Sequence, residues 1–224
     1  MAARWNRLNQ GAGVHHRMKK LALFFCLLPA LTLLGRAQEM RQDVSLSGML
    51  TIQQYVEGGA PNNVRAKATL GPGMLLSYRF QLTPNGAVEA NYSYTRYTEK
   101  FTDSQYQYPT LQYVRVLTSV QEATFGYVQT IPFKKFNPFV EAGGGVLFFS
   151  PLGGIKTTSY DTEMEESLVG FLGGGIAYEL STRWDLRMAY RGYLAHPQTF
   201  GLKQFDTGRT EIISQPFIGF AYHF

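Results

Sequence analysis

Apolar and polar side chains alternate with a period of two through most of the chain after residue 43, and no segment there has convincing helical periodicity. In the last ten residues, small or polar side chains are interleaved with an apolar face made of Pro216, Ile218, Phe220, Tyr222 and Phe224. Successive side chains of a β-strand point to opposite faces, so this pattern predicts a strand with one apolar face. Seven further segments alternate in the same way, and the predicted strands are 44–55, 67–81, 87–97, 119–131, 138–149, 168–180, 184–194 and 215–224.

The connectors between these predicted strands alternate in length. The short ones, rich in turn-forming residues, are 82–86, 132–137 and 181–183, and between them lie longer connectors at about 56–66, 98–118, 150–167 and 195–212. Residues 113–118 could instead belong to the fourth strand. Such alternation is typical of an eight-stranded antiparallel up-and-down transmembrane β-barrel, which has its short turns on the periplasmic side and four long loops outside. Strand 215–224 is expected to pair with 44–55, because barrel closure removes both exposed sheet edges.

Eight charged residues within the predicted strands fall on the less apolar face of their strand. An arginine or lysine that faced lipid near the middle of the membrane would cost about 2–4 kcal/mol. We therefore expect the charges to point into the lumen and the apolar faces to point outward, the reverse of a soluble barrel such as a lipocalin. The predicted lumen charge network consists of Arg79, Glu89, Glu122, Glu141, Glu179, Asp185, Arg187 and Arg191.

An eight-stranded barrel has an interior that side chains just fill, so these charges are expected to pair and to plug the lumen. The alternative is a charge-lined ion conduit. Two glycine triplets, 143–145 and 173–175, lie in neighbouring predicted strands, and their inward members should make room for long side chains such as Arg187 or Arg191. Aromatic residues near the short turns should form a periplasmic girdle of Phe80, Phe133, Phe136, Tyr178, Trp184 and Phe224.

The first 37 residues have the organisation of a secretory signal. A basic stretch at Met18-Lys19-Lys20 precedes an apolar run, and a small-residue ending predicts cleavage after Ala37. We expect Met18 to be the true start and residues 38–224 to form the barrel domain. All six basic residues before position 38 are lost on cleavage, leaving 15 basic and 16 acidic residues, a net charge of −1 instead of +5. The basic balance therefore belongs to the export signal, which argues against nucleic acid as a partner.

The mature chain offers little for cofactor or active-site chemistry. It has no cysteine, which excludes disulfides and thiol-ligated metals, and the acidic stretch 161–166 lacks the spacing and turn glycine of a calcium loop. We therefore predict no cofactor and no metal site. The only histidines after cleavage are His196 and His223, and neither has a serine two residues away, so an enzyme is not expected.

Segments 138–145, 173–180 and 184–191 resemble the corresponding strands of OmpA-like eight-stranded outer-membrane β-barrel proteins. The closing segment 220–224, with Phe220, Tyr222 and Phe224, resembles the C-terminal signal that the barrel assembly machinery recognises in its clients. The sequence departs from the full OmpA plan because it ends at the barrel with no peptidoglycan-binding domain, so a direct cell-wall tether is not implied.

This resemblance implies a location in the outer membrane of a Gram-negative cell, in contact with its lipid and lipopolysaccharide. A structural or surface-interaction role through four extracellular loops, with an unidentified surface ligand, is the leading hypothesis. A narrow porin-like channel for small solutes or ions is the alternative, and a lipid A-modifying enzyme is the third hypothesis.

Overall fold

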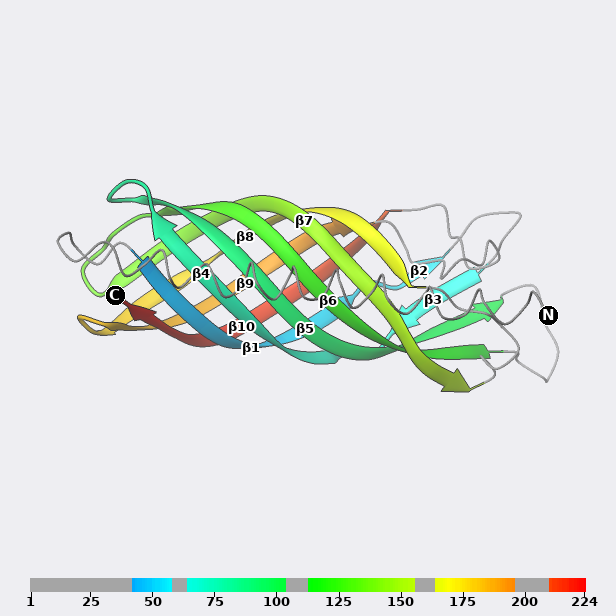
Figure 1. The fold of residues 1–224 in the computed structure, drawn as a ribbon. Coiled ribbons are helices and arrows are strands. Elements are labelled where there is room, and N and C mark those ends of the chain that lie inside the picture. The colour runs from blue at the N-terminus through cyan, green and yellow to red at the C-terminus, as the bar shows by residue number, and fades with distance from the viewer. Residues whose placement is uncertain (1–41, 58–63, 104–112, 156–163, 196–209) are drawn as a thin grey trace, which may run out of the picture. The chain divides into compact units, whose positions relative to one another are not determined.

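A computed structural model describes residues 42–57, 64–103, 113–155, 164–195 and 210–224 (Figure 1). The predicted signal peptide with Met18, the acidic stretch 161–163 and His196 lie outside these ranges. Within the described ranges the regular elements are strands: β1 (Gln42–Gln53), β2 (Val56–Glu57), β3 (Val64–Ala68), β4 (Gly71–Gln81), β5 (Gly86–Asp103), β6 (Tyr113–Thr130), β7 (Phe136–Ile155), β8 (Glu165–Ser181), β9 (Trp184–Ala195) and β10 (Glu211–His223). In this part of the chain, no helix is long and apolar enough to cross a membrane.

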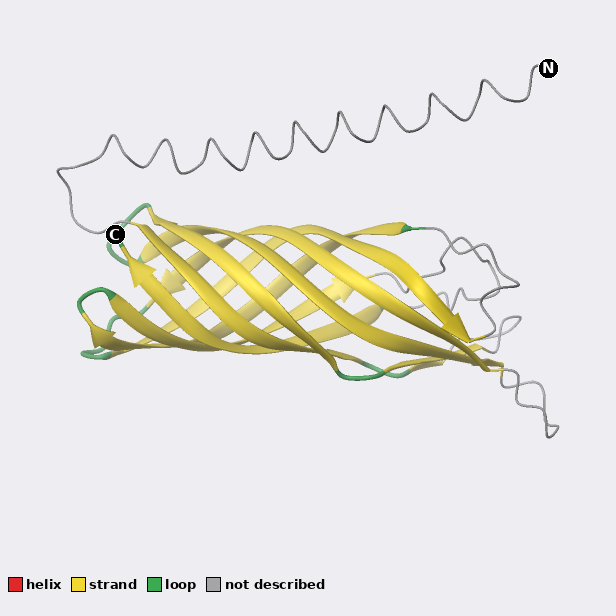
Figure 2. Cartoon of the chain, turned by 60° about the horizontal axis from the view of Figure 1, so that its bottom comes forward, coloured by secondary structure: helices red, strands yellow, loops and turns green. Residues whose placement is uncertain are grey.

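The strands form one closed antiparallel barrel. Around the barrel the order is β1, β4, β5, β6, β7, β8, β9 and β10, and β10 pairs with β1 to complete the circle. The strands wrap obliquely around the barrel axis, and the turns β4–β5, β6–β7 and β8–β9 lie at the same end as Phe224 (Figures 1 and 2). The predicted eight-stranded architecture and its closure are confirmed. We call the end with these three turns the turn end and the opposite end the loop end.

The predicted strand 67–81 is divided into β3 and β4. Thr69 and Leu70 lie between them, where the Thr69 N–H donates to the carbonyl of Thr98 and the Thr69 hydroxyl oxygen accepts from the Thr98 N–H, each at 3.0 Å. These two hydrogen bonds hold the interruption against β5, the strand with which both β3 and β4 pair. β2 extends the sheet beyond β3.

Several strands are longer than predicted at the loop end. β5 and β6 pair without interruption from Gly86↔Gln129 to Thr102↔Tyr113, so most of the predicted connector 98–118 is strand. β7 likewise continues to Ile155. The sequence pattern ends earlier because the outward face of β5 becomes polar at Thr98 and Lys100, which removes the apolar alternation without ending the strand.

The polarity of the barrel is inverted relative to a soluble protein. Outward side chains are large and apolar, and Leu168 and Leu172 are 80% and 70% exposed. Buried positions hold most of the charged residues of the predicted lumen network. The expected orientation, with apolar faces outward and charges inward, is confirmed.

The interior is not polar along its whole length. Toward the loop end it contains an apolar cluster made of Tyr97, Val116, Val120, Leu147, Phe149, Val169, Phe171, Tyr193, Ala195 and Ile213. This cluster was not predicted, because several of these residues lie near or beyond the predicted strand ends. It lies inside the barrel on the loop side of the charged centre.

Aromatic rings gather at the turn end, as predicted. The ring centres of Phe136 and Tyr178 are 4.9 Å apart, and those of Trp184 and Tyr222 are 5.1 Å apart. Phe224 stacks on Tyr222 with the ring centres 6.4 Å apart. Rings at this level match the aromatic belt of a membrane-spanning barrel.

Candidate functional site

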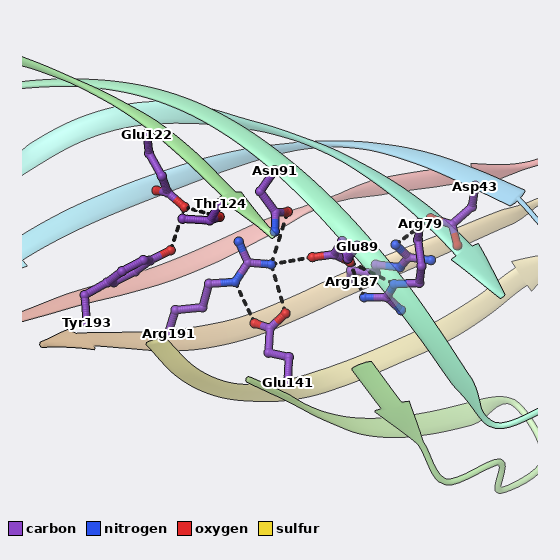
Figure 3. Close-up of polar contacts among 10 residues, drawn as sticks. All are labelled: Asp43, Arg79, Glu89, Asn91, Glu122, Thr124, Glu141, Arg187, Arg191 and Tyr193. Atoms are coloured by element: carbon purple, nitrogen blue, oxygen red, sulfur yellow. Dashed lines mark hydrogen bonds and ion pairs between the residues drawn. The ribbon is translucent and has the colours of Figure 1, made fainter. Parts of the chain in front are cut away.

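Arg191 is the centre of the charged network in the lumen. It projects inward from β9 and is only 1% exposed. Its Nε and Nη2 donate to the two carboxylate oxygens of Glu141, on β7, at 2.6 and 2.9 Å. Nη2 also donates to Glu89 Oε1, on β5, at 2.6 Å (Figure 3). A paired guanidinium–carboxylate contact fixes both distance and orientation, so Arg191 is held in one position across the interior.

Two aromatic rings and one glycine complete the environment of Arg191. The guanidinium carbon lies 5.3 Å from the ring centre of Phe171 and 4.8 Å from that of Phe217, both within range of a cation–π interaction. A Cβ added to Gly173 would lie 2.7 Å from Glu141 Oε1 and 3.0 Å from Arg191 Cγ. The expectation that an inward glycine makes room for Arg191 is confirmed at Gly173.

Glu89 connects Arg191 to a second arginine. Arg79 lies directly opposite Glu89 in the β4–β5 register, and its Nε and Nη2 lie 2.8 and 2.6 Å from Glu89 Oε2. The Arg79 guanidinium carbon also lies 5.1 Å from the ring centre of Phe139. One carboxylate therefore binds two arginines, one from a neighbouring strand and one from across the lumen.

The turn-end part of the network includes two residues that the sequence did not place in it. Arg187 donates to Asp43 Oδ1 at 2.8 Å, and Asp43 lies one position before the predicted start of the first strand. His223 lies 2.8 Å from Asp185 Oδ2 through Nε2 and 3.9 Å from Asp43 Oδ2 through Nδ1. Asp43 lies directly opposite His223 where β1 pairs with β10. Aligning the last predicted strand with the first would therefore have brought Asp43 and His223 together.

Glu122 is inside the lumen, as predicted, but in a different chemical setting. It accepts hydrogen bonds from three hydroxyls: Ser93 at 2.8 Å, Thr124 at 2.9 Å and Tyr193 at 2.8 Å. Figure 3 shows the bonds from Thr124 and Tyr193. Hydrogen bonds to a charged acceptor are strong, so these hydroxyls stabilise a buried carboxylate without an arginine. Glu122 therefore lies apart from the salt bridges around Arg191.

Glu179 lies at the turn-end rim of the lumen and not among the buried charges. Its side chain is exposed and accepts a hydrogen bond from Asn137 Nδ2 at 2.7 Å. The pairing of β8 with β9 is irregular between Glu179 and Ser181, at the rim of the barrel, where an inward position opens to solvent. Two buried acids at the other end of the interior, Glu99 and Glu211, were missed because they lie in predicted connectors.

A polar cavity of about 430 Å³ opens at the turn end. Its lining includes Asp43, Arg79, Asn137, Glu179, Arg187 and His223. Arg79 and Arg187 separate it from the centre of the lumen by their salt bridges to Glu89 and Asp43. Among the residues that the structure describes, no group of three or more His, Cys, Asp or Glu side chains could hold a metal ion. We call this cavity the vestibule.

Two solved structures share this architecture. Neisserial surface protein A (NspA) has a TM-score of 0.54 and 11% sequence identity, covering 82% of this chain and 97% of that chain. The outer membrane protein OprG from Pseudomonas aeruginosa has a TM-score of 0.50 and 14% identity, covering 82% of this chain and 95% of that chain. No family model matches the sequence, and no curated protein sequence matches it either. The predicted resemblance to eight-stranded outer-membrane barrels is confirmed at the level of the fold.

Proposed function

We propose that this chain, which has the eight-stranded barrel fold of outer-membrane proteins, is an integral outer-membrane protein with a closed lumen. The inverted polarity supports the location, because rows of exposed leucine, phenylalanine and tyrosine side chains would be costly in water and are favourable in lipid. The aromatic residues at the turn end give one boundary of the membrane layer. The turn end would then face the periplasm and the loop end the outside, as in other outer-membrane barrels.

The contact of Arg191 with Glu89 and Glu141 carries the proposal of a closed lumen. β9 and β5 are four strands apart in either direction around the barrel, so Arg191 reaches the opposite wall. An ion that passed this level would have to separate a buried arginine from two carboxylates, which is strongly unfavourable in a poorly hydrated interior. The apolar cluster beyond it adds a second obstruction.

A closed barrel would serve as a structural protein of the membrane or bind a partner at the cell surface. The segments between the strand ends on this side, residues 58–63, 104–112, 156–164 and 196–210, are the ones that would meet a surface ligand. An unidentified surface partner, contacted through these loops, is therefore the proposed route to function. During biogenesis, Phe220, Tyr222 and Phe224 would be recognised by the barrel assembly machinery.

A planar-bilayer measurement on the refolded protein tests the closed lumen. We expect no steady current from the unmodified barrel. Steady open-state current from the unmodified protein would overturn the closed lumen. Cell fractionation, with the heat-dependent gel mobility of folded barrels as readout, tests the outer-membrane location separately.

The alternative of a narrow channel draws on the polar vestibule of about 430 Å³ at the turn end. If Arg79 and Arg187 moved aside, this vestibule would become the periplasmic mouth of a pore. Liposome swelling with small sugars and amino acids distinguishes the two functions. Swelling rates equal to those of protein-free liposomes are expected for the closed barrel.

We propose that the chain is not an enzyme. His223 is bound by Asp185 and Asp43, and in the described part of the chain no hydroxyl nucleophile is hydrogen-bonded to it. A lipid A-modifying activity would be detected by comparing lipid A mass spectra from expressing and deleted strains. Identical spectra are expected.

A further inference from the structure

Two buried glutamates face the interior at the loop end of the barrel, Glu99 on β5 and Glu211 on β10. They are 4% and 6% exposed. Glu99 lies near the loop end of β5, and Glu211 is the first residue of β10. Each therefore lies close to the point where a strand meets one of the loop-end segments, 104–112 after β5 and 196–210 before β10.

A hydrogen bond between β1 and β5 brings the two glutamates to the same level. Gln53 Nε2 on β1 donates to the Tyr97 hydroxyl on β5 at 2.6 Å. Gln53 also lies directly opposite Ile213 on β10. One inward position further toward the loop end, β5 carries Glu99 and β10 carries Glu211. The two carboxylates therefore lie on the loop side of this hydrogen bond, and both act electrostatically on the Tyr97 hydroxyl.

The residues beside the two glutamates in the sheet are small or apolar. Directly opposite Glu99 are Ala68 on β3 and Val116 on β6. Directly opposite Glu211 is Ala195 on β9. Glu99 Oε1 is buried without a hydrogen-bond partner, and among the described residues neither glutamate forms an ion pair. Their negative charges are therefore not neutralised by their neighbours in the sheet.

A third acid adds to the negative charge inside, whereas the basic residues at this level lie outside. The charge of Glu165 on β8 also repels that of Glu99. Lys67, Lys100 and Arg115 share the outer face of the sheet. Lys100 is directly opposite the other two and follows the inward Glu99. Neighbouring buried carboxylates cannot all be ionised without strong repulsion, so one of them retains a proton.

Glu99 is the acid whose protonation the barrel changes most clearly. Its outward neighbours Thr98 and Lys100 are polar, so this level lies at the headgroups, outside the membrane-spanning part of the strand. Burial and, after it, the charge of Glu211 raise the pKa of Glu99 to about 8. The folded barrel therefore binds this proton more tightly than the unfolded chain. The resulting stabilisation is complete below the pKa of an unfolded glutamate, about 4.3, and is lost as the pH rises through about 8.

We propose that Glu99 and Glu211 form a proton-operated latch at the loop-end mouth of the barrel, which holds the ends of β5 and β10 beside the Gln53–Tyr97 hydrogen bond. A proton on one of the two carboxyl groups removes their repulsion, and the mouth stays packed. Loss of that proton to solvent leaves two buried carboxylates side by side, so the two strand ends separate and admit water. The latch goes beyond the proposed function, because it sets the order of the loop end whichever partner binds there.

Urea unfolding of the full-length mature barrel, refolded in phosphatidylcholine vesicles, tests the latch at pH 7 and pH 9. A proton bound with a pKa of about 8 predicts that the unfolding equilibrium constant rises about tenfold over this interval. The variant Glu99→Gln/Glu211→Gln keeps the size of both side chains and cannot ionise, so its constant should change less than about twofold. Glu166→Gln, which removes an exposed carboxylate at the same end, is the control and should keep the full rise.

A local probe shows where in the barrel the pH acts. The sequence has a single cysteine, Cys26, before the predicted cleavage site, so a cysteine introduced at Thr210 would carry the only spin label of the mature chain. We expect the label in Thr210→Cys to be more mobile at pH 9 than at pH 7, and this difference to disappear when Glu99→Gln/Glu211→Gln is added. A label in Leu82→Cys, at the turn end, is the control and should be equally mobile at both pH values.

Equal unfolding constants of the unmodified barrel at pH 7 and pH 9 would overturn the inference, as would a full rise in Glu99→Gln/Glu211→Gln. A change in stability with unchanged mobility of the label in Thr210→Cys would place the titrating group elsewhere and would also overturn it. Gel mobility before heating shows insertion of each variant at both pH values. Failure of the unmodified chain to insert would refute the proposed location, whereas insertion without a pH response refutes only the latch.

Discussion

Arg191 Nη2 lies 2.6 Å from Glu89 Oε1 although 102 residues separate the two in the sequence. Their strands face each other across the barrel, and Glu141 on a third strand accepts from the same guanidinium. The network therefore ties together three walls of the barrel at one level. Removal of one member would leave buried charges without partners, which strongly lowers the stability of the folded state.

Replacing Arg191 with methionine keeps much of the side-chain length and removes the charge. We expect Arg191→Met to lower the free energy of unfolding by about 3–5 kcal/mol, because Glu141 stays buried without its cation and Glu89 keeps only Arg79. Urea unfolding of the barrel in lipid vesicles, followed by tryptophan fluorescence, measures the change. Arg183→Met, at an exposed turn position, is the control and should change the free energy by less than about 0.5 kcal/mol.

Neutralising Glu141 as well should reverse part of this loss. In the double variant Arg191→Met/Glu141→Gln, Glu89 keeps its salt bridge to Arg79 and Glu141 no longer carries an unpaired charge, so it should be more stable than Arg191→Met alone. If the double variant is the less stable of the two, the cost lies in packing around Phe171 and Phe217 and not in unpaired charge.

Gly173 is predicted to tolerate no side chain. A methyl group there would meet Glu141 Oε1, the Tyr190 carbonyl oxygen and Arg191 Cγ at 2.7–3.0 Å, so Gly173→Ala should destabilise the barrel by about 1–3 kcal/mol. Gly170→Ala on the same strand is the matched control, since its added Cβ would face outward, 3.9 Å from the nearest atom. Comparable urea midpoints for the two variants would contradict the close packing around Arg191.

The sequence could place these charges inside the barrel but could not show which of them meet. Alternation decides the face of a residue, because lipid requires an apolar outside, and this reasoning was correct for Arg79, Glu89 and Arg191. It says nothing about how far each strand is shifted along its neighbours. The contact between β9 and β5 depends on the sum of these shifts around half the barrel, so it appears only in the structure.

The failures have physical causes at the two ends of the barrel. Glu179 occupies an inward position in the alternation of β8 but lies at a rim that is open to solvent. The alternation alone therefore overestimated its burial. Glu99 and Glu211 are buried beyond the apolar outer surface, where lipid no longer imposes alternation on the outward positions. Asp43 lies just before the first apolar position that made the strand recognisable.

Tyr193 should contribute to stability through Glu122. Tyr193→Phe removes one of the three hydroxyls that bind this buried carboxylate, so we expect a loss of about 1.5–3 kcal/mol in the free energy of unfolding. Tyr190→Phe, three residues earlier and facing outward, loses only an exposed hydrogen bond to Ser214 and should cost about 0.5–1 kcal/mol. Urea unfolding of both variants under one set of conditions gives the comparison, and the reverse order would show that Glu122 does not depend on Tyr193.

Phe224 is expected to matter for assembly of the barrel and not for any surface activity. Its backbone N–H donates to the Gln42 carbonyl at 2.9 Å, at the seam where β10 meets β1, and its ring stacks on Tyr222. Deleting Phe224 removes the last hydrogen bond of this seam and the ring nearest the end of the strand. We expect several-fold less heat-modifiable, membrane-inserted protein in cells.

Phe133→Ala is the control, because it removes a more exposed aromatic ring at the same end without touching the seam. Spontaneous refolding of the purified deletion variant into lipid vesicles separates the two causes of a defect: near-normal refolding yield with poor insertion in cells indicates lost recognition by the assembly machinery, whereas a poor yield in both indicates a weakened seam. Normal insertion in cells would refute the assembly role of Phe224.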